Sequence, residues 1–105
     1  MDSKNIFDVS GKTIIITGAA GMLGTEYAKG LSEKGANVVL ADLDFKKCKE
    51  ISLELGKKYA NKTLPINLDL TKILSIKNMV KKVVKKYGKI DVLVNNAAYQ
   101  GDDKL

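Results

Sequence analysis

Three glycines at three-residue spacing, Gly18, Gly21 and Gly24, link a short β-branched segment at residues 13–17 to a segment with helical periodicity. Gly18 can adopt the unusual backbone angles of a sharp turn after a buried strand. The absence of a Cβ at Gly21 lets a diphosphate approach the main chain, and Gly24 lets the helix pack closely against the strand. Unpaired N–H groups at the start of this helix would face the anion. An ordinary glycine turn is the alternative, but the flanking strand and helix favour a diphosphate site.

Asp42 lies 18 positions after Gly24, where the apolar segment 37–41 ends. An acidic side chain at this position can accept hydrogen bonds from the 2′- and 3′-hydroxyls of an adenosine ribose, and its charge repels a 2′-phosphate. The sequence therefore predicts NAD as the cofactor, with NADP less favoured, although Lys46 and Lys47 reduce the expected repulsion. The alternatives for Asp42 are a carboxylate in a solvated turn and a helix cap.

Asp69 follows the apolar segment 63–67 in the stretch N-L-D-L-T. A nucleotide base that crosses the carboxyl ends of the strands would lie near Asp69, so the carboxylate can accept a hydrogen bond from an adenine amino group. Capping of the next helix by Asp69 or Thr71 is an equally good interpretation, because both residue types suit the N-cap position.

Two amides, Asn95 and Asn96, follow the last apolar segment in the stretch V-L-V-N-N-A-A-Y. Their side chains can bind neighbouring main chains and hold the loop open, while the small Ala97 and Ala98 let a ribose approach. An ordinary asparagine-rich turn is the alternative.

The residues expected to contact the cofactor belong to the glycine turn, to the start of the following helix and to the ends of the later strands. They are Gly18, Ala20, Gly21, Met22, Leu23, Gly24, Asp42, Leu43, Asp69, Leu70, Asn95, Ala97 and Ala98. The usual zinc sites and triads that use histidine as a base are excluded, because the sequence contains no histidine and only one cysteine. We expect no metal site.

The elements that position these residues alternate between strands and helices. The expected strands cover residues 13–17, 37–41, 63–67 and 90–95, and the expected helices cover 22–34, 44–58 and a segment from just after Thr71 to about Tyr87. This order predicts an α/β fold with a doubly wound parallel sheet, strand order 3-2-1-4 and helices on both faces. Pro65 places the third strand at a sheet edge, because proline cannot donate a ladder hydrogen bond.

The apolar spacing within each helix predicts the side that faces the sheet. The first helix has Leu23, Tyr27 and Leu31 along one side, with Ala28 beside them. The second helix has Cys48 on its apolar side with Phe45, Ile51 and Leu55, so we expect the thiol to be buried in packing. The third helix is expected to point Ile76, Val80, Val83, Val84 and Tyr87 inward.

The composition is that of one small globular domain, with 105 residues, 45% hydrophobic residues and a net charge of +6. All 18 basic residues are lysine, which argues against a nucleic-acid partner because base and phosphate recognition favours arginine. The densest lysine cluster fits the solvated face of a helix; it comprises Lys81, Lys82, Lys85, Lys86 and Lys89. No apolar run approaches the roughly 20 residues of a membrane span, and residues 1–11 lack a secretion-signal pattern. We therefore expect no membrane partner and a cytoplasmic location.

The four motifs together resemble those of the short-chain dehydrogenase/reductase family. T-G-A-A-G-M-L-G resembles the glycine motif of that family, Asp42 its NAD-selecting acid, D-L-T at 69–71 its adenine-binding acid and turn, and N-N-A-A its N-N-A-G motif. The resemblance covers residues 12–99. It implies a Rossmann-like NAD-binding fold and hydride transfer between a substrate alcohol or carbonyl carbon and nicotinamide C4.

The motifs depart from the family pattern at two places. The spacing T-G-x-x-G-x-x-G is similar to that of the extended, sugar-nucleotide-modifying branch, whereas the commonest short members have T-G-x-x-x-G-x-G. This spacing favours a sugar or sugar nucleotide as the substrate. Ala98 also replaces the usual glycine of the fourth motif.

The proton-transfer residues of the family are not found in this sequence. In the family a tyrosine, a lysine four residues later and an upstream serine carry this step, and here no tyrosine has a lysine four residues later. We therefore expect residues 1–105 to be a single NAD(P)-binding domain, apparently truncated from a longer oxidoreductase, with no catalytic residue of its own. The alternative is a noncatalytic NAD-binding or regulatory module that is complete at this length.

The last expected strand, I-D-V-L-V-N at 90–95, is apolar on both faces and should have a further strand beside it. Its unpaired edge would invite association with another chain. We therefore expect a homo-oligomer that forms through this strand.

Overall fold

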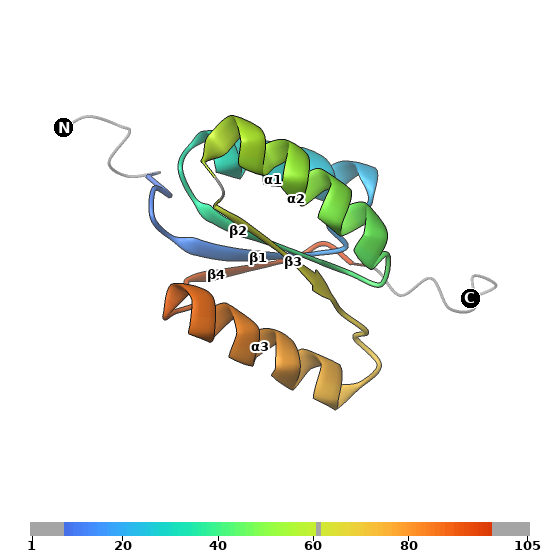
Figure 1. Cartoon of the computed structure of the whole chain (residues 1–105). Helices are drawn as coiled ribbons and strands as arrows, with labels where there is room; N and C mark the ends of the chain where they lie inside the picture. The colour runs from blue at the N-terminus through green and yellow to red at the C-terminus, as the bar shows by residue number, and fades with distance from the viewer. Residues whose placement is uncertain (1–7, 61, 98–105) are drawn as a thin grey trace.

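The computed structural model describes residues 8–60 and 62–97 and contains the expected alternation of strands and helices. The elements are β1 (Thr13–Thr17), α1 (Met22–Glu33), β2 (Asn37–Asp42), α2 (Phe45–Tyr59), β3 (Thr63–Asn67), α3 (Ile73–Tyr87) and β4 (Val92–Asn95). All strand pairs are parallel, in the order β3-β2-β1-β4. Helices α1 and α2 lie on one face of the sheet and α3 on the other (Figure 1). The predicted doubly wound, Rossmann-like arrangement is therefore confirmed, including the edge position of β3 and Pro65.

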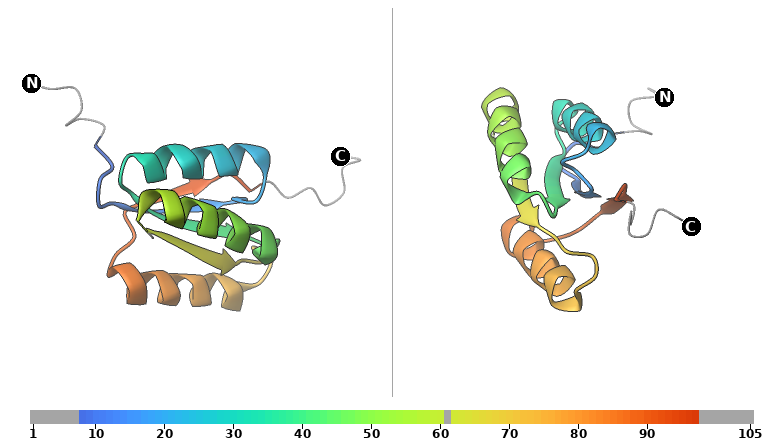
Figure 2. Two further views of the ribbon diagram at one scale, coloured as in Figure 1. Left: turned by 45° about the horizontal axis from the view of Figure 1, so that its top comes forward. Right: turned by 90° about the vertical axis from the view of Figure 1, so that its right-hand side faces the viewer.

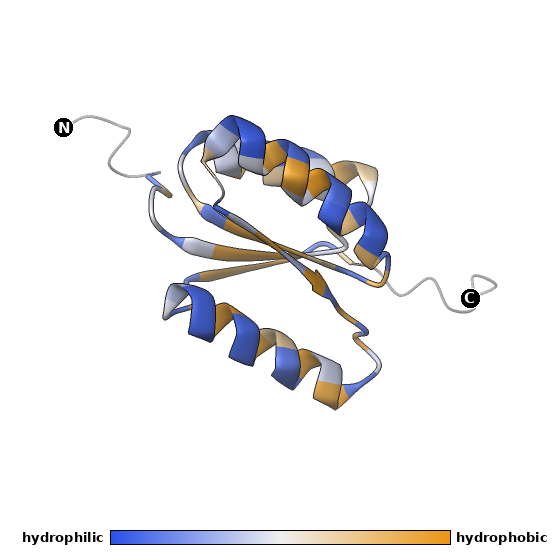
Figure 3. Ribbon diagram, in the orientation of Figure 1, coloured by the Kyte–Doolittle hydropathy of each residue, from blue (hydrophilic) through white to orange (hydrophobic). Residues whose placement is uncertain are grey.

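The core consists of two apolar layers that share the central strand β1. Ile14 and Ile16 pack with α1 and α2, whereas Ile15 packs with Met79 and Val83 of α3. All five residues of β1 are buried, as its continuous apolar run predicted. Figure 2 shows the helices on the two sides of the sheet between which these layers lie, and the strands carry mostly the hydrophobic colour in Figure 3.

Local sequence signals set the ends of the helices. The side chain of Asp44 accepts a hydrogen bond from the N–H of Lys47 at 3.1 Å and caps α2, as expected. Helix α3 ends at Gly88, whose φ of +80° is the left-handed conformation that glycine adopts without a steric cost.

The prediction for the buried side of α1 holds for Ala28 and in part for Leu31, which packs against the core while partly buried, but not for the other two residues. Helix α1 buries Gly24, Ala28 and Ser32, whereas Leu23 is 54% exposed and Tyr27 is 41% exposed. Small residues spaced four apart let the helix axis approach the sheet closely, so the large side chains lie beside the contact rather than in it.

The buried side of α3 also differs from the prediction. Met79 and Val83 are buried, Ile76 and Tyr87 are partly buried against them, and Val80 and Val84 are exposed. The reason is the position of the helix, because β3 is the strand with which α3 makes most contact, and the residues that face it are the buried ones. Val80 is 40% exposed and Val84 is 44% exposed, so this side of α3 is only partly covered by the described residues. The predicted lysine face of this helix is solvent-exposed, as expected.

Strand β4 is shorter and more exposed than expected. It begins at Val92 rather than Ile90. Just before the strand, Asp91 is bonded to β1 through both its main chain and its side chain: its N–H donates to Thr13 O at 2.9 Å and its carboxylate accepts from Thr13 N–H at 2.8 Å. The hydrogen bond from Thr13 N–H to the carboxylate, and a second one from Lys89, hold the pKa of Asp91 below its usual value. Leu93 is 57% exposed, since no described strand pairs with the far side of β4.

Cys48 is completely buried in the layer beneath α2, so the predicted packing role is confirmed. Burial raises the pKa of its thiol to about 12, and the negative charges of Asp42 and Asp44 add to the effect. The thiol is therefore protonated at neutral pH. Within residues 8–60 and 62–97, none of the helices has the length and apolar character required to cross a bilayer.

Candidate functional site

The carboxyl ends of the strands bring together residues that are far apart in the sequence. In the sheet register, Thr17 at the end of β1 lies opposite Ala41 of β2 and Asn95 of β4. The glycine turn that follows Thr17 therefore lies between Asp42 and the loop that follows Asn95. Ligands of open α/β sheets bind at this edge, where the connections from neighbouring strands run to opposite faces.

Three successive N–H groups of the glycine turn are held by acceptors within the protein. Ala19 N–H donates to Ala41 O at 3.2 Å, Ala20 N–H to Asp42 Oδ2 at 3.1 Å, and Gly21 N–H to Gly18 O at 3.1 Å. The turn is therefore ordered by its own hydrogen bonds.

The start of α1 supplies free hydrogen-bond donors. Thr25 N–H is the first to bond back, to Gly21 O at 2.9 Å. Among the described residues, nothing accepts from the N–H groups of Met22, Leu23 and Gly24. The side chains of Met22 and Leu23 are exposed, so solvent reaches this end of the helix. Such a helix N-terminus attracts anions through its N–H groups and its dipole.

The three glycines of the turn serve different purposes. Gly18 has a φ of +69°, and a Cβ there would lie 2.9 Å from Ala97 Cα. A Cβ at Gly24 would lie 2.8 Å from Ala19 Cα, as the predicted close packing of helix and strand requires. A Cβ at Gly21 would meet only Gly18 O, at an ordinary 3.5 Å. Within the described part of the chain, packing therefore explains Gly18 and Gly24 but not Gly21.

The carboxylate of Asp42 faces the glycine turn from the end of β2. Its Oδ2 accepts from Ala20 N–H, and its Oδ1 accepts from Asp44 N–H at 2.9 Å. An ionised carboxylate offers about four acceptor sites. Two sites remain for ligand hydroxyl groups, and the half-buried position of Asp42 leaves it accessible. The interpretations of Asp42 as a solvated turn carboxylate or a helix cap do not account for its bond to the glycine turn. Its side chain joins that turn to the loop after β2.

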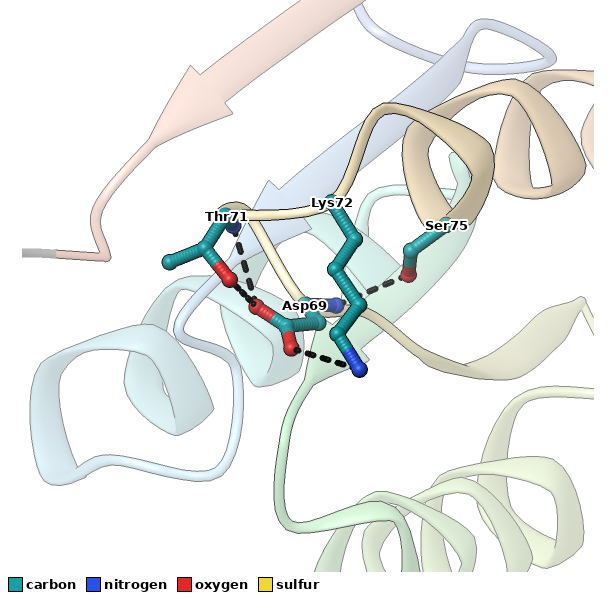
Figure 4. Close-up of polar contacts among 4 residues, drawn as sticks. All are labelled: Asp69, Thr71, Lys72 and Ser75. Carbon is teal, nitrogen blue, oxygen red and sulfur yellow. Dashed lines mark hydrogen bonds and ion pairs between the residues drawn. The ribbon is translucent and has the colours of Figure 1, made fainter.

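Asp69 lies in a hydrogen-bonded loop between β3 and α3 (Figure 4). Its Oδ1 accepts from both the N–H of Thr71 at 3.0 Å and the hydroxyl of Thr71 at 2.6 Å, while its own N–H donates to Ser75 Oγ at 2.9 Å. These bonds from Thr71 lower the pKa of Asp69, and the nearby charge of Lys72 adds a smaller effect. The carboxylate is thus ionised and fixed in orientation at neutral pH.

Neither Asp69 nor Thr71 occupies the N-cap position of α3, so the capping interpretation is wrong. The N-cap of α3 is Lys72, and the described residues provide no side-chain cap there. Asp69 orders the loop before the helix instead, and the polar partner that the described residues offer to its Oδ2 is the Nζ of Lys72 at 4.0 Å. Sequence reasoning missed Ser75, which is the third residue of α3 and gave no separate signal.

The loop after β4 is tied to the glycine turn by polar side chains. Thr17 Oγ1 donates to Asn95 Oδ1 at 3.0 Å and accepts from Ala97 N–H at 3.1 Å. Asn96 Nδ2 donates to Gly18 O at 3.3 Å. The expectation that the amides bind neighbouring main chain is confirmed for Asn96, whereas Asn95 binds the Thr17 side chain. Thr17 was not among the predicted site residues, and Ala98 lies outside the described residues.

Apolar side chains flank the two acidic loops. Leu43 follows Asp42 and is 69% exposed, and Leu70 follows Asp69 and is 49% exposed. An exposed leucine can pack against the face of a heteroaromatic ring, and the carboxylate beside it can accept hydrogen bonds from the ring or from its attached sugar. The described residues contain no group of three His, Cys, Asp or Glu side chains that could hold a metal ion.

Comparisons with known proteins agree with this geometry. A family model described as short chain dehydrogenase matches residues 12–105. Retinol dehydrogenase 13 of Mus musculus is 37% identical over 91 residues, which are 86% of this chain and 27% of that relative. The NADP-dependent 3-hydroxy acid dehydrogenase of Schizosaccharomyces pombe is 36% identical over 99 residues, covering 92% of this chain and 38% of the relative.

A solved structure gives the same result. The crystal structure of 3-ketoacyl-(acyl-carrier-protein) reductase from Brucella melitensis, complexed with NADH, has a TM-score of 0.79 and 34% identity. The match covers 85% of this chain and 35% of that chain. The chain therefore spans only part of the length of the relatives it matches. Because the family model extends over most of the sequence, the chain belongs to the short-chain dehydrogenase family.

Proposed function

We propose that this chain holds the adenosine and diphosphate of NAD in a short-chain dehydrogenase, with the adenosine ribose bound by Asp42. The observation that carries the proposal is the position of Asp42, whose carboxylate lies beside the glycine turn and retains acceptor sites. The free N–H groups of Met22 and Leu23 would bind the diphosphate. The unexplained lack of a side chain at Gly21 supports this assignment, because an approaching anion requires bare main chain there.

The other predicted contacts extend this site along the strand ends. The adenine ring would lie between Leu43 and Leu70, with the free oxygen of Asp69 toward its amino group. The nicotinamide end would lie toward Asn95 and Ala97, with Ala20 close to the ribose and diphosphate. When bound, NAD supplies the carbon that accepts or donates a hydride.

The reaction proposed is interconversion of an alcohol and a carbonyl compound. The names of the relatives include retinol and 3-hydroxy acid dehydrogenases, which supports the alcohol or carbonyl class without favouring one member. The glycine spacing favours a sugar or sugar nucleotide, and this remains a prediction. We assign the residues of this chain to cofactor binding and none of them to proton transfer.

Calorimetric titration of the 105-residue chain with NAD and NADP tests the cofactor assignment. We expect NAD to bind more tightly than NADP, because the Asp42 carboxylate accepts from the ribose hydroxyls and repels a 2′-phosphate. Asp42→Ala should weaken NAD binding at least about tenfold, since hydrogen bonds to a charged group contribute about 1.5–3 kcal/mol, and should narrow the difference between the two cofactors.

Glu54→Ala is the matched control, because it removes one carboxylate from the exposed surface of α2. It should leave the NAD affinity unchanged. Equal binding of NAD and NADP by the unmodified chain, or equal losses in the two variants, would contradict the assignment of Asp42.

The exposed edge of β4 supports a second proposal, that this chain self-associates through that strand. Its outer backbone groups, which pair with none of the described strands, and its exposed Leu93 offer a template for another strand. Light scattering at tens of micromolar should detect dimers or larger species. Leu93→Lys should reduce them, whereas Leu53→Lys, a control at a residue 66% exposed on α2, should not. A monodisperse monomer would refute this mode of association.

A further inference from the structure

We propose that Thr25 is a positioning residue for the diphosphate site, because it and Asp42 together fix the peptide unit between Ala19 and Ala20. The inference rests on the proposed function, since it assigns an indirect role in cofactor binding to the Thr25 hydroxyl, which is hydrogen-bonded to the main chain. It concerns how the glycine turn is held before any ligand arrives.

Two side chains from different elements hold the two polar ends of one peptide unit. The C=O of Ala19 accepts a hydrogen bond from Thr25 Oγ1 of α1 at 2.9 Å. The N–H of Ala20 donates to Asp42 Oδ2 at the end of β2 at 3.1 Å. Because a C=O and the following N–H lie in one rigid plane, the two bonds together prevent that plane from rotating.

The neighbouring peptide units of the turn are held differently. Ala19 N–H and Gly21 N–H both donate to main-chain carbonyl oxygens, so the sheet and the turn themselves keep them in place. Counting the bonds between described residues, the Ala19–Ala20 unit is the one in this turn that depends on side chains at both ends. Its orientation can therefore be changed by a single substitution that leaves the rest of the turn bonded.

This peptide plane precedes the helix start that would bind the diphosphate. Gly21 is the N-cap of α1, and the free N–H groups of Met22 and Leu23 follow it. A rotation of the Ala19–Ala20 unit would change the direction of the chain into Gly21 and hence the aim of these donors. The strength of charge-assisted hydrogen bonds to phosphate depends on the direction in which these N–H groups point.

Substitution of Thr25 tests the positioning role separately from direct contact with the ligand. Asp42 would contact the ribose as well as the turn, so its replacement removes both functions at once. The half-buried Thr25 has its hydroxyl bonded to Ala19 O. A variant at Thr25 should therefore affect ligands that carry a diphosphate and spare ligands that lack one.

The test compares adenosine diphosphate with adenosine on the 105-residue chain, by calorimetry or by NMR titration. Thr25→Val removes the hydroxyl and keeps the shape of the side chain, whereas Thr25→Ser keeps the hydroxyl. We expect Thr25→Val to weaken adenosine diphosphate binding by about threefold to tenfold, as for the loss of one well-placed hydrogen bond. Adenosine binding should change less than about twofold, and Thr25→Ser should behave like the unmodified chain.

The outcomes separate this inference from the proposed function. If the unmodified chain binds adenosine diphosphate no better than adenosine, the diphosphate site itself is refuted. If it prefers the diphosphate and Thr25→Val weakens both ligands equally or neither, only the positioning role is overturned, because general destabilisation would not discriminate between them.

Hydrogen exchange of the unmodified chain provides a test that does not depend on a variant folding. Without ligand, the amide of Ala20 should exchange at least about tenfold more slowly than that of Met22, because the first is bonded to Asp42 and the second has no acceptor among the described residues. Equal exchange rates at the two amides would show that the peptide unit is not held, and would overturn the proposal.

Discussion

Gly24→Ala is expected to lower the free energy of unfolding by about 2–3 kcal/mol, although alanine is intrinsically the better helix former by about 1 kcal/mol. The added Cβ would lie 2.8 Å from Ala19 Cα and closer still to Gly18 O. Both neighbours are backbone atoms of a turn that is fixed by its own hydrogen bonds, so they cannot move aside at low cost. Urea unfolding followed by circular dichroism measures the change.

Gly30→Ala is the matched control in the same helix. A Cβ at Gly30 meets no atom within 4 Å, so this variant should gain about 0.5–1 kcal/mol from helix propensity alone. The two substitutions are chemically identical and should have opposite signs. If Gly24→Ala were also stabilising, the close approach of α1 to the turn would be wrong.

Gly21→Ala is expected to leave the fold nearly intact while weakening NAD binding at least about tenfold, which corresponds to about 1.4 kcal/mol. The new methyl group has room within the protein, because its nearest neighbour is Gly18 O at 3.5 Å. The N-cap preference for glycine over alanine costs at most about 1 kcal/mol of stability. In the proposed complex, however, the methyl group would occupy the space through which the diphosphate approaches the N–H groups of Met22 and Leu23.

Calorimetry and urea unfolding of the same Gly21→Ala sample separate binding from stability. Gly30→Ala serves again as the control, since it should bind NAD as the unmodified chain does. Wild-type NAD affinity in Gly21→Ala would contradict the placement of the diphosphate, and a large loss of stability would show that packing, rather than a ligand, requires this glycine.

The two substitutions illustrate what the pattern of glycines does and does not reveal. The spacing of Gly18, Gly21 and Gly24 between a strand and a helix predicts the turn, because local periodicity and backbone freedom are properties of short segments. The separate reason for each glycine depends on which atoms surround it. Those atoms come partly from Asn96 and Ala97, which are distant in the sequence.

The prediction of which helix residues face the core is limited in the same way, because it too depends on neighbours that are distant in the sequence. Periodicity correctly predicts where α1 and α3 lie in the chain, but it does not predict that Tyr27 and Val84 are left exposed. A helix in this fold buries the residues above the strands it covers. That choice depends on where it crosses the sheet and on how closely small residues let it approach.

The sequence alone therefore determined the order of strands and helices, the strand order of the sheet and the positions of the acidic residues at the strand ends, because these follow from local periodicity and from general rules of chain connection. Only the tertiary structure decided how the site is held together. Thr17 meets Asn95 and Ala97 across 78 and 80 positions of the chain, and Ala20 meets Asp42 across 22. Hydrogen bonds of this kind depend on distances of a few ångströms between separate elements, which exist only after the sheet has brought the strand ends side by side.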